Sequence, residues 1–89
     1  MNELITYVKV PSGRRKGQLR GVVVAIGRDK IGWSQANEKA GDTFNKERGI
    51  AIARTRALKG SPEKAKVPYD VQKTVNYMIS RAKRYFKVQ

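Results

Sequence analysis

The residues most able to do chemistry in this chain are its cations. Twenty Lys and Arg residues stand against 7 Asp and Glu residues among 89, which gives a formal net charge of +13. Such an excess repels itself in a compact protein and exceeds what solubility requires. Lysines and arginines that neutralise phosphates release condensed counterions, so a polyanion best accounts for this charge. We therefore expect the partner to be a nucleic acid or else a strongly acidic protein.

The densest group of cations is Arg14, Arg15 and Lys16, which lie between Gly13 and Gly17 at the tip of a predicted hairpin. A basic loop that projects from a β-ribbon can enter a groove or grip phosphates. The alternative is a solubilising tip, because charge also keeps sheet edges from pairing. Three adjacent cations between glycines exceed what solubility needs. We expect phosphate contacts from the following residues: Arg14, Arg15, Lys16 and Arg20.

A second group of cations lies along the first predicted helix and comprises Arg48, Arg56 and Lys59. Helical spacing places these three on the outer side, where they either track a phosphate backbone or are plainly solvated. Arg54 points in another direction. We expect it to pair with Glu47 or to cover apolar surface with its aliphatic stem.

For the C-terminal cations and for Trp33, a structural role explains the residues better than contact with a nucleic acid does. The last cations of the chain, Arg81, Lys83, Arg84 and Lys87, lie where positive charge offsets a helix dipole, and phosphate contact is the alternative. Trp33 is the single tryptophan, and we expect a core anchor rather than a platform on which a base stacks.

Residues suited to catalysis are few. The chain has no cysteine and no histidine, which removes thiolate ligands, zinc sites and the common nucleophile–base pairs. A paired-carboxylate enzyme needs two or more acids to converge. The closest local pair is Glu38 with Asp42, and helix capping explains Asp42 better. We predict a non-enzymatic protein with no metal and no cofactor.

The first third of the chain has to supply strands that position the basic tip. Residues 4–10 are rich in β-branched and aromatic side chains, and residues 18–26 contain the continuous run Val22-Val23-Val24. Such a run is typical of a strand buried on both faces. Residues 30–34 form a short third strand, and two tight connections favour an antiparallel meander over residues 1–34.

Two helices are predicted to follow. The first, over residues 43–59, has Asp42 or Thr43 as its cap and stops at Gly60-Ser61-Pro62. Its expected apolar face is Phe44, Ile50, Ala51, Ala57 and Leu58. The second, over residues 68–87, carries one apolar arc of Val71, Val75, Met78, Ile79, Ala82, Tyr85 and Phe86. The fold class is therefore α+β, a single domain over residues 1–89 with a three-stranded antiparallel sheet followed by two helices packed on it.

One motif resembles a known pattern. Ile31-Gly32-Trp33-Ser34 is followed by Asn37, Phe44, Lys46, Gly49, Ile52-Ala53 and Arg56-Ala57. This resembles small uncharacterised phage-encoded basic proteins, in which an IGWS strand leads through a polar loop into an F-x-K-x-x-G-x-x-I-A-x-x-R-A helix. The resemblance covers about a third of the chain and assigns no functional residues. It implies a phage origin and a role in binding nucleic acid or inhibiting host machinery.

These observations predict a nucleic-acid-binding protein, with DNA favoured over RNA. The alternative is a phage inhibitor or adaptor that docks on an acidic surface of a host protein through charge complementarity and a few buried anchors. No apolar run approaches a membrane span, and the N-terminus lacks the features of a signal peptide. We therefore expect no membrane partner and a cytoplasmic location, in the host if the protein is phage-encoded. Strandedness, sequence specificity and oligomeric state are left open.

Overall fold

The fold consists of one sheet and two helices. The computed structural model describes residues 3–10, 13–14, 16–36, 44–60 and 67–86. In chain order the elements are β1 (Leu4–Lys9), β2 (Leu19–Gly27), β3 (Lys30–Gln35), α1 (Lys46–Ala57) and α2 (Tyr69–Tyr85). The strands form one antiparallel sheet in the order β1-β2-β3. This confirms the predicted α+β class, with an antiparallel three-stranded sheet followed by two helices.

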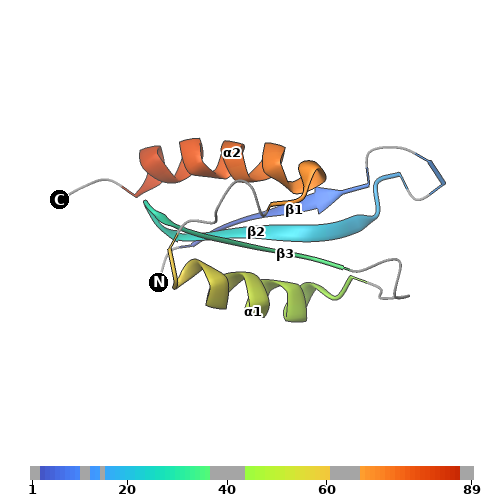
Figure 1. Cartoon of the computed structure of the whole chain (residues 1–89), viewed down its shortest axis with the longest axis horizontal. Coiled ribbons are helices and arrows are strands. Elements are labelled where there is room, and N and C mark those ends of the chain that lie inside the picture. The colour runs from blue at the N-terminus through green and yellow to red at the C-terminus, as the bar shows by residue number, and fades with distance from the viewer. Residues whose placement is uncertain (1–2, 11–12, 15, 37–43, 61–66, 87–89) are drawn as a thin grey trace.

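The two helices cover opposite faces of the sheet (Figure 1). Neighbouring strands lie about 4.8 Å apart, so three strands are about as wide as one helix, and one helix can cover each face. Val23 of β2 belongs to the core under α2, whereas Val22 and Val24 belong to the core under α1. The central strand is therefore buried on both faces, as its continuous valine run predicted.

Helix α2 packs on the sheet through the predicted apolar arc. Val71, Val75, Met78 and Ala82 are buried in one core cluster with side chains of all three strands. The prediction was wrong for Tyr85, which is 50% exposed. Tyr85 is the last residue of the helix, and its ring makes an edge-to-face contact with Phe86, at 5.0 Å between ring centroids.

Helix α1 is shorter than the predicted span of residues 43–59. Its cap is Asn45, whose side chain accepts a hydrogen bond from the backbone N–H of Arg48 at 3.0 Å. The predicted caps Asp42 and Thr43 lie outside the described residues. The predicted apolar face was wrong for Leu58, which is 62% exposed, and for Ala51, which is also exposed.

The buried face of α1 is a stripe of small residues that touches the backbone of β3. A methyl group on Gly32 would overlap the Ala53 carbonyl oxygen and lie 2.5 Å from the Ala57 nitrogen. Beside this contact, the Ser34 hydroxyl donates a buried hydrogen bond to the Gly49 carbonyl oxygen at 2.8 Å. All five residues belong to the motif that runs from the third strand into the first helix, so this part of the motif serves close packing.

Candidate nucleic-acid interface

The basic hairpin tip is shaped by backbone hydrogen bonds and two glycines. The Gly17 N–H donates to the Val10 carbonyl at 3.0 Å, and the Lys16 N–H donates to the Gly13 carbonyl at 3.2 Å. Gly13 and Gly17 both have φ of +88°, a backbone conformation that residues with a Cβ rarely adopt. The glycines that flank the cations in the sequence are therefore what allows the chain to turn there.

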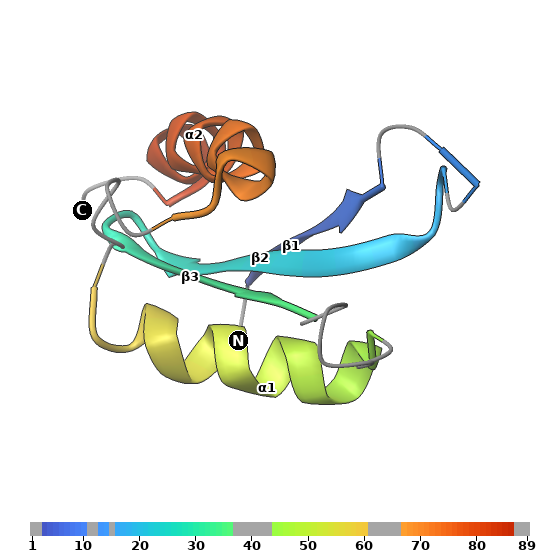
Figure 2. The same ribbon diagram turned by 45° about the vertical axis from the view of Figure 1, so that its right-hand side comes forward.

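Figure 1 and Figure 2 show the β1–β2 hairpin projecting beyond both helices. Arg14 and Lys16 are exposed at this projecting end. Neither side chain makes a hydrogen bond or an ion pair with any other residue in the described part of the chain. Arg15 lies outside the described residues. The tip is thus a protruding zone of positive charge held on a two-stranded support.

Arg20 differs from the tip cations because it is paired. Its guanidinium donates to the Asp70 carboxylate at 2.5 Å, and its side chain is only 20% exposed. Val8 pairs with Gly21 and Lys9 pairs with Leu19, so Arg20 is the extra residue of a β-bulge. A bulge re-aims the side chain it carries. Arg20 therefore ties β2 to the first turn of α2, and Asp70 neutralises its charge in the free protein.

Arg54 also has an acidic partner, although not the predicted one. It forms a two-pronged pair with Glu3: Nε donates to Oε2 at 3.0 Å, and Nη2 donates to Oε1 at 2.5 Å. The prediction of Glu47 as a partner was wrong. The hydrogen bonds from the Arg54 guanidinium hold the pKa of the Glu3 carboxyl below its ordinary value. The pair joins α1 to the start of β1.

Arg56 is engaged with Trp33. Its guanidinium lies 5.2 Å from the centroid of the indole ring, a cation–π contact, and its Nη1 donates to the Trp33 carbonyl oxygen at 2.9 Å. Trp33 is partly buried and packs against the core under α2 without being one of its buried residues, so it lies beside the core and is not its anchor. Arg56 thus packs on an aromatic neighbour at the edge of the sheet.

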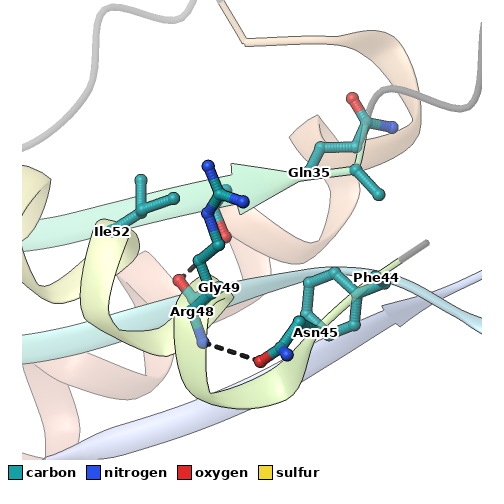
Figure 3. A pocket seen from close by; sticks show the side chains of 8 residues that line it. Gln35, Phe44, Asn45, Arg48, Gly49 and Ile52 are labelled. Atoms are coloured by element: carbon teal, nitrogen blue, oxygen red, sulfur yellow. Dashed lines mark hydrogen bonds between the residues drawn. The ribbon is translucent and has the colours of Figure 1, made fainter. Parts of the chain in front are cut away.

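Arg48 lines a hollow of about 340 Å³ between the end of β3 and the start of α1. Figure 3 shows its guanidinium between Ile52 and Gln35, with the ring of Phe44 on another side of the hollow. Lys59 is exposed just beyond the other end of α1. Eleven residues at a rise of about 1.5 Å each separate the two cations by roughly 16 Å. The structure does not bring Arg48 and Lys59 together as one contact.

Exposed aromatic side chains gather on α2, a feature that sequence reasoning missed. Tyr69 is 87% exposed and Tyr77 is 53% exposed, and Tyr85 lies half-exposed at the end of the same helix. The available signal was helical spacing, because Tyr69 and Tyr77 are eight residues apart and both fall opposite the apolar arc. The polar face of α2 therefore carries aromatic rings among its cations.

Neither a metal site nor a membrane-spanning helix is found among the described residues. No three acidic residues there gather into a group able to hold a metal ion. Neither helix in these ranges has the length and apolar character needed to cross a membrane. Compared with models of known families, with curated proteins and with solved structures, the chain matches none.

Proposed function

We propose that this chain is a non-enzymatic nucleic-acid-binding protein whose β1–β2 hairpin grips the phosphate backbone. The observation that carries the proposal is the position of Arg14 and Lys16. They stand exposed at the end of a hairpin that projects beyond both helices, with no acidic partner in the described part of the chain. Arg15 lies between them in the sequence and adds a third charge.

The construction of the tip suits phosphate contact for a physical reason. A projecting ribbon reaches a polyanion before the bulk of the protein does, and cations without internal partners lose no ion pair on binding. Each phosphate that they neutralise releases counterions, which favours association. The second zone predicted from the sequence lies on α1, where Arg48 and Lys59 are exposed and Arg56 packs on Trp33. Among the predicted residues, the tip cations are therefore the better placed.

The test is the salt dependence of binding to labelled duplex and single strands. Fluorescence anisotropy between about 50 and 200 mM salt should show a log–log slope of about −0.9 per phosphate contacted on duplex DNA. The double variant Arg14→Gln/Lys16→Gln should weaken binding and reduce the magnitude of that slope by about 2. Arg28→Gln/Lys30→Gln is the matched control, because it removes the same two residue types from exposed positions in the β2–β3 turn and at the start of β3. A shallow slope for the wild-type protein would contradict the proposal.

The competing function, docking on an acidic host protein, has its own readout. A pull-down from nuclease-treated lysate should lose its bound material if nucleic acid is the partner. Retention of a single acidic protein, released by Arg14→Gln/Lys16→Gln, would favour the inhibitor or adaptor instead. Cleavage of the labelled strands that stops on addition of a chelator would contradict the non-enzymatic part of the proposal.

A further inference from the structure

The side of α2 that faces away from the sheet carries polar, cationic and aromatic side chains. Positions four, seven and eleven residues after Lys73 lie close to one line along a helix, opposite the buried stripe. We define the outer face of α2 by six residues, all of them exposed: Lys73, Asn76, Tyr77, Ser80, Lys83 and Arg84. From Lys73 to Arg84 this face extends roughly 16 Å.

The outer face of α2 differs from an ordinary solvated helix face in its charge. Helix surfaces are commonly stabilised by acid–base pairs three or four residues apart. Helix α2 contains one acidic residue, Asp70, which is paired with Arg20. Within the described ranges, Lys73, Lys83 and Arg84 make no ion pair and no side-chain hydrogen bond. Dipole compensation accounts for cations in the last turn, but not for Lys73 in the first half or for an exposed tyrosine between them.

Three of the four cations of α1 already make contacts inside the protein. Arg54 is paired with Glu3, Arg56 packs on Trp33, and the ammonium group of Lys46 lies 5.5 Å from the centroid of the Tyr7 ring. Binding a phosphate through these side chains would compete with contacts already made inside the protein. On α1 this leaves Arg48 alone, whereas the outer face of α2 carries three cations without such contacts among the described residues, so it is the better candidate for a partner.

Helix α2 is an outer layer of the described structure. It is the single described helix on its face of the sheet, and no other described element lies on top of it (Figures 1 and 2). A helix with open flanks has room for a phosphate backbone on either side. The major groove of B-DNA, about 12 Å wide, admits one α-helix.

We infer that α2 inserts its outer face into the major groove of double-stranded DNA. Asn76, Ser80 and Arg84 are residue types that read base edges, while lysines and the Tyr77 hydroxyl are suited to phosphate oxygens. This inference rests on the proposed function and deepens it by naming the form of nucleic acid and the element that reads it.

The hairpin and α2 are placed to act on the same duplex. In both views the end of β2 that leads from the hairpin tip bends toward the side of the sheet that carries α2. The Arg20–Asp70 pair joins this end of β2 to the first turn of α2. A duplex lying along α2 can therefore meet the tip cations on its backbone, whereas α1 lies on the far face of the sheet.

The groove requirement discriminates among nucleic acids. The major groove of duplex RNA is deep and narrow and excludes a helix, and a single strand has no groove. In anisotropy titrations at equal salt, the full chain should bind a mixed-sequence DNA duplex more tightly than the RNA duplex or single DNA strand of the same sequence. Equal or tighter binding to either alternative would overturn the inference while leaving nucleic-acid binding by the tip intact.

The variant Lys73→Gln/Arg84→Gln tests the assignment of the face. It should weaken duplex binding by about tenfold or more and reduce the magnitude of the salt slope by about 2. Arg28→Gln/Lys30→Gln is again the charge-matched control, and thermal melting should show that all variants are folded. If the α2 variant binds like this control while Arg14→Gln/Lys16→Gln is impaired, the inference is wrong and the proposed function stands. If the wild-type protein does not bind at all, the proposed function is wrong.

Base reading by α2 has a separate, charge-neutral test. Repeated selection from a randomised DNA duplex should enrich a preferred sequence for the wild-type protein. Asn76→Ala should then weaken binding to that sequence by about tenfold, with the salt slope unchanged because no phosphate contact is lost. Failure to enrich any sequence, or an unaltered affinity of Asn76→Ala, would overturn the assignment of α2 as the reading element.

Discussion

At the scale of single residues, Gly32 decides whether α1 can lie on β3. No Cβ fits at this position, because the backbone of α1 at Ala53 and Ala57 occupies the space. Backbone atoms of a helix cannot move aside as the end of a flexible side chain can. This explains why the buried side of α1 consists of Gly49, Ala53 and Ala57 rather than of larger apolar residues.

Gly32→Ala is expected to destabilise the protein by about 3 kcal/mol or more, because one inserted methyl group forces the helix away from the sheet. Denaturant unfolding followed by circular dichroism measures this change. The matched control is Gly27→Ala in β2, where a new Cβ would meet only the Lys30 side chain at 3.6 Å or more. The control should change stability by no more than about 1 kcal/mol. Equal effects of the two substitutions would refute the close-contact explanation.

The Glu3–Arg54 pair produces a pH-dependent contribution to stability. Because folding lowers the pKa of Glu3, its carboxylate stabilises the folded state above its unfolded pKa of about 4. This contribution is lost as the pH falls through the lower pKa of the folded state. Glu3→Gln should therefore lower the melting temperature near about pH 7, with the difference from wild type closing toward about pH 3.

Thermal melting across this pH range provides the measurement. Glu47→Gln is the control, since it removes an exposed carboxylate that makes no ion pair with any described residue. A constant difference between Glu3→Gln and wild type at every pH would show that the pair does not act through its charge.

At the scale of secondary-structure elements, the β-bulge in β2 connects the sheet to α2. Strand alternation alone would place Arg20 on the same face as Val22, which packs under α1. The extra residue instead allows Arg20 to reach Asp70 in the first turn of α2. The Arg20–Asp70 ion pair thereby connects the basic hairpin to the helix that carries the outer face.

Asp70→Asn should raise the affinity for duplex DNA, because it removes the acid paired with Arg20 beside the hairpin, which is also the one acid of α2. An increase of about one in the magnitude of the log–log salt slope is expected if Arg20 then contacts a phosphate. Anisotropy titrations check this, with Glu47→Gln as a control that makes the same charge change on α1, the opposite face of the sheet. If both variants strengthen binding equally, net charge rather than Arg20 is responsible.

At the scale of the whole molecule, the net charge of +13 opposes folding. Added salt screens repulsion between exposed charges, with a Debye length of about 30 Å at 0.01 M and about 10 Å at 0.1 M. The melting temperature of the protein should therefore rise between these two salt concentrations. Differential scanning calorimetry measures it, and a fall over this range would mean that attractive ion pairs outweigh the repulsion.

Two kinds of structure were predictable from local patterns. The valine run marked β2 as a strand buried on both faces, and the spacing of Val71, Val75, Met78 and Ala82 marked the buried stripe of α2. Both succeed because burial recurs with the period of the element that carries it. On α1 the same reasoning was right for Phe44, Ile50 and Ala57. It was wrong for Ala51 and Leu58, since the contact with β3 depends on Gly32 and on small side chains whose apolar signal is weak.

By itself the sequence determined the α+β order of elements, the doubly buried central strand and the net charge of +13. Only the tertiary structure decided that the helices lie on opposite faces, and which cations are already engaged. The partners of Arg20 and Arg54 lie 50 and 51 residues away in the chain, and Arg56 meets Trp33 across 23 residues. Residue types and local spacing do not predict such contacts, because only the packing of the elements brings the two partners together. That packing also left the outer face of α2 exposed, and its cations make no ion pair with a described residue.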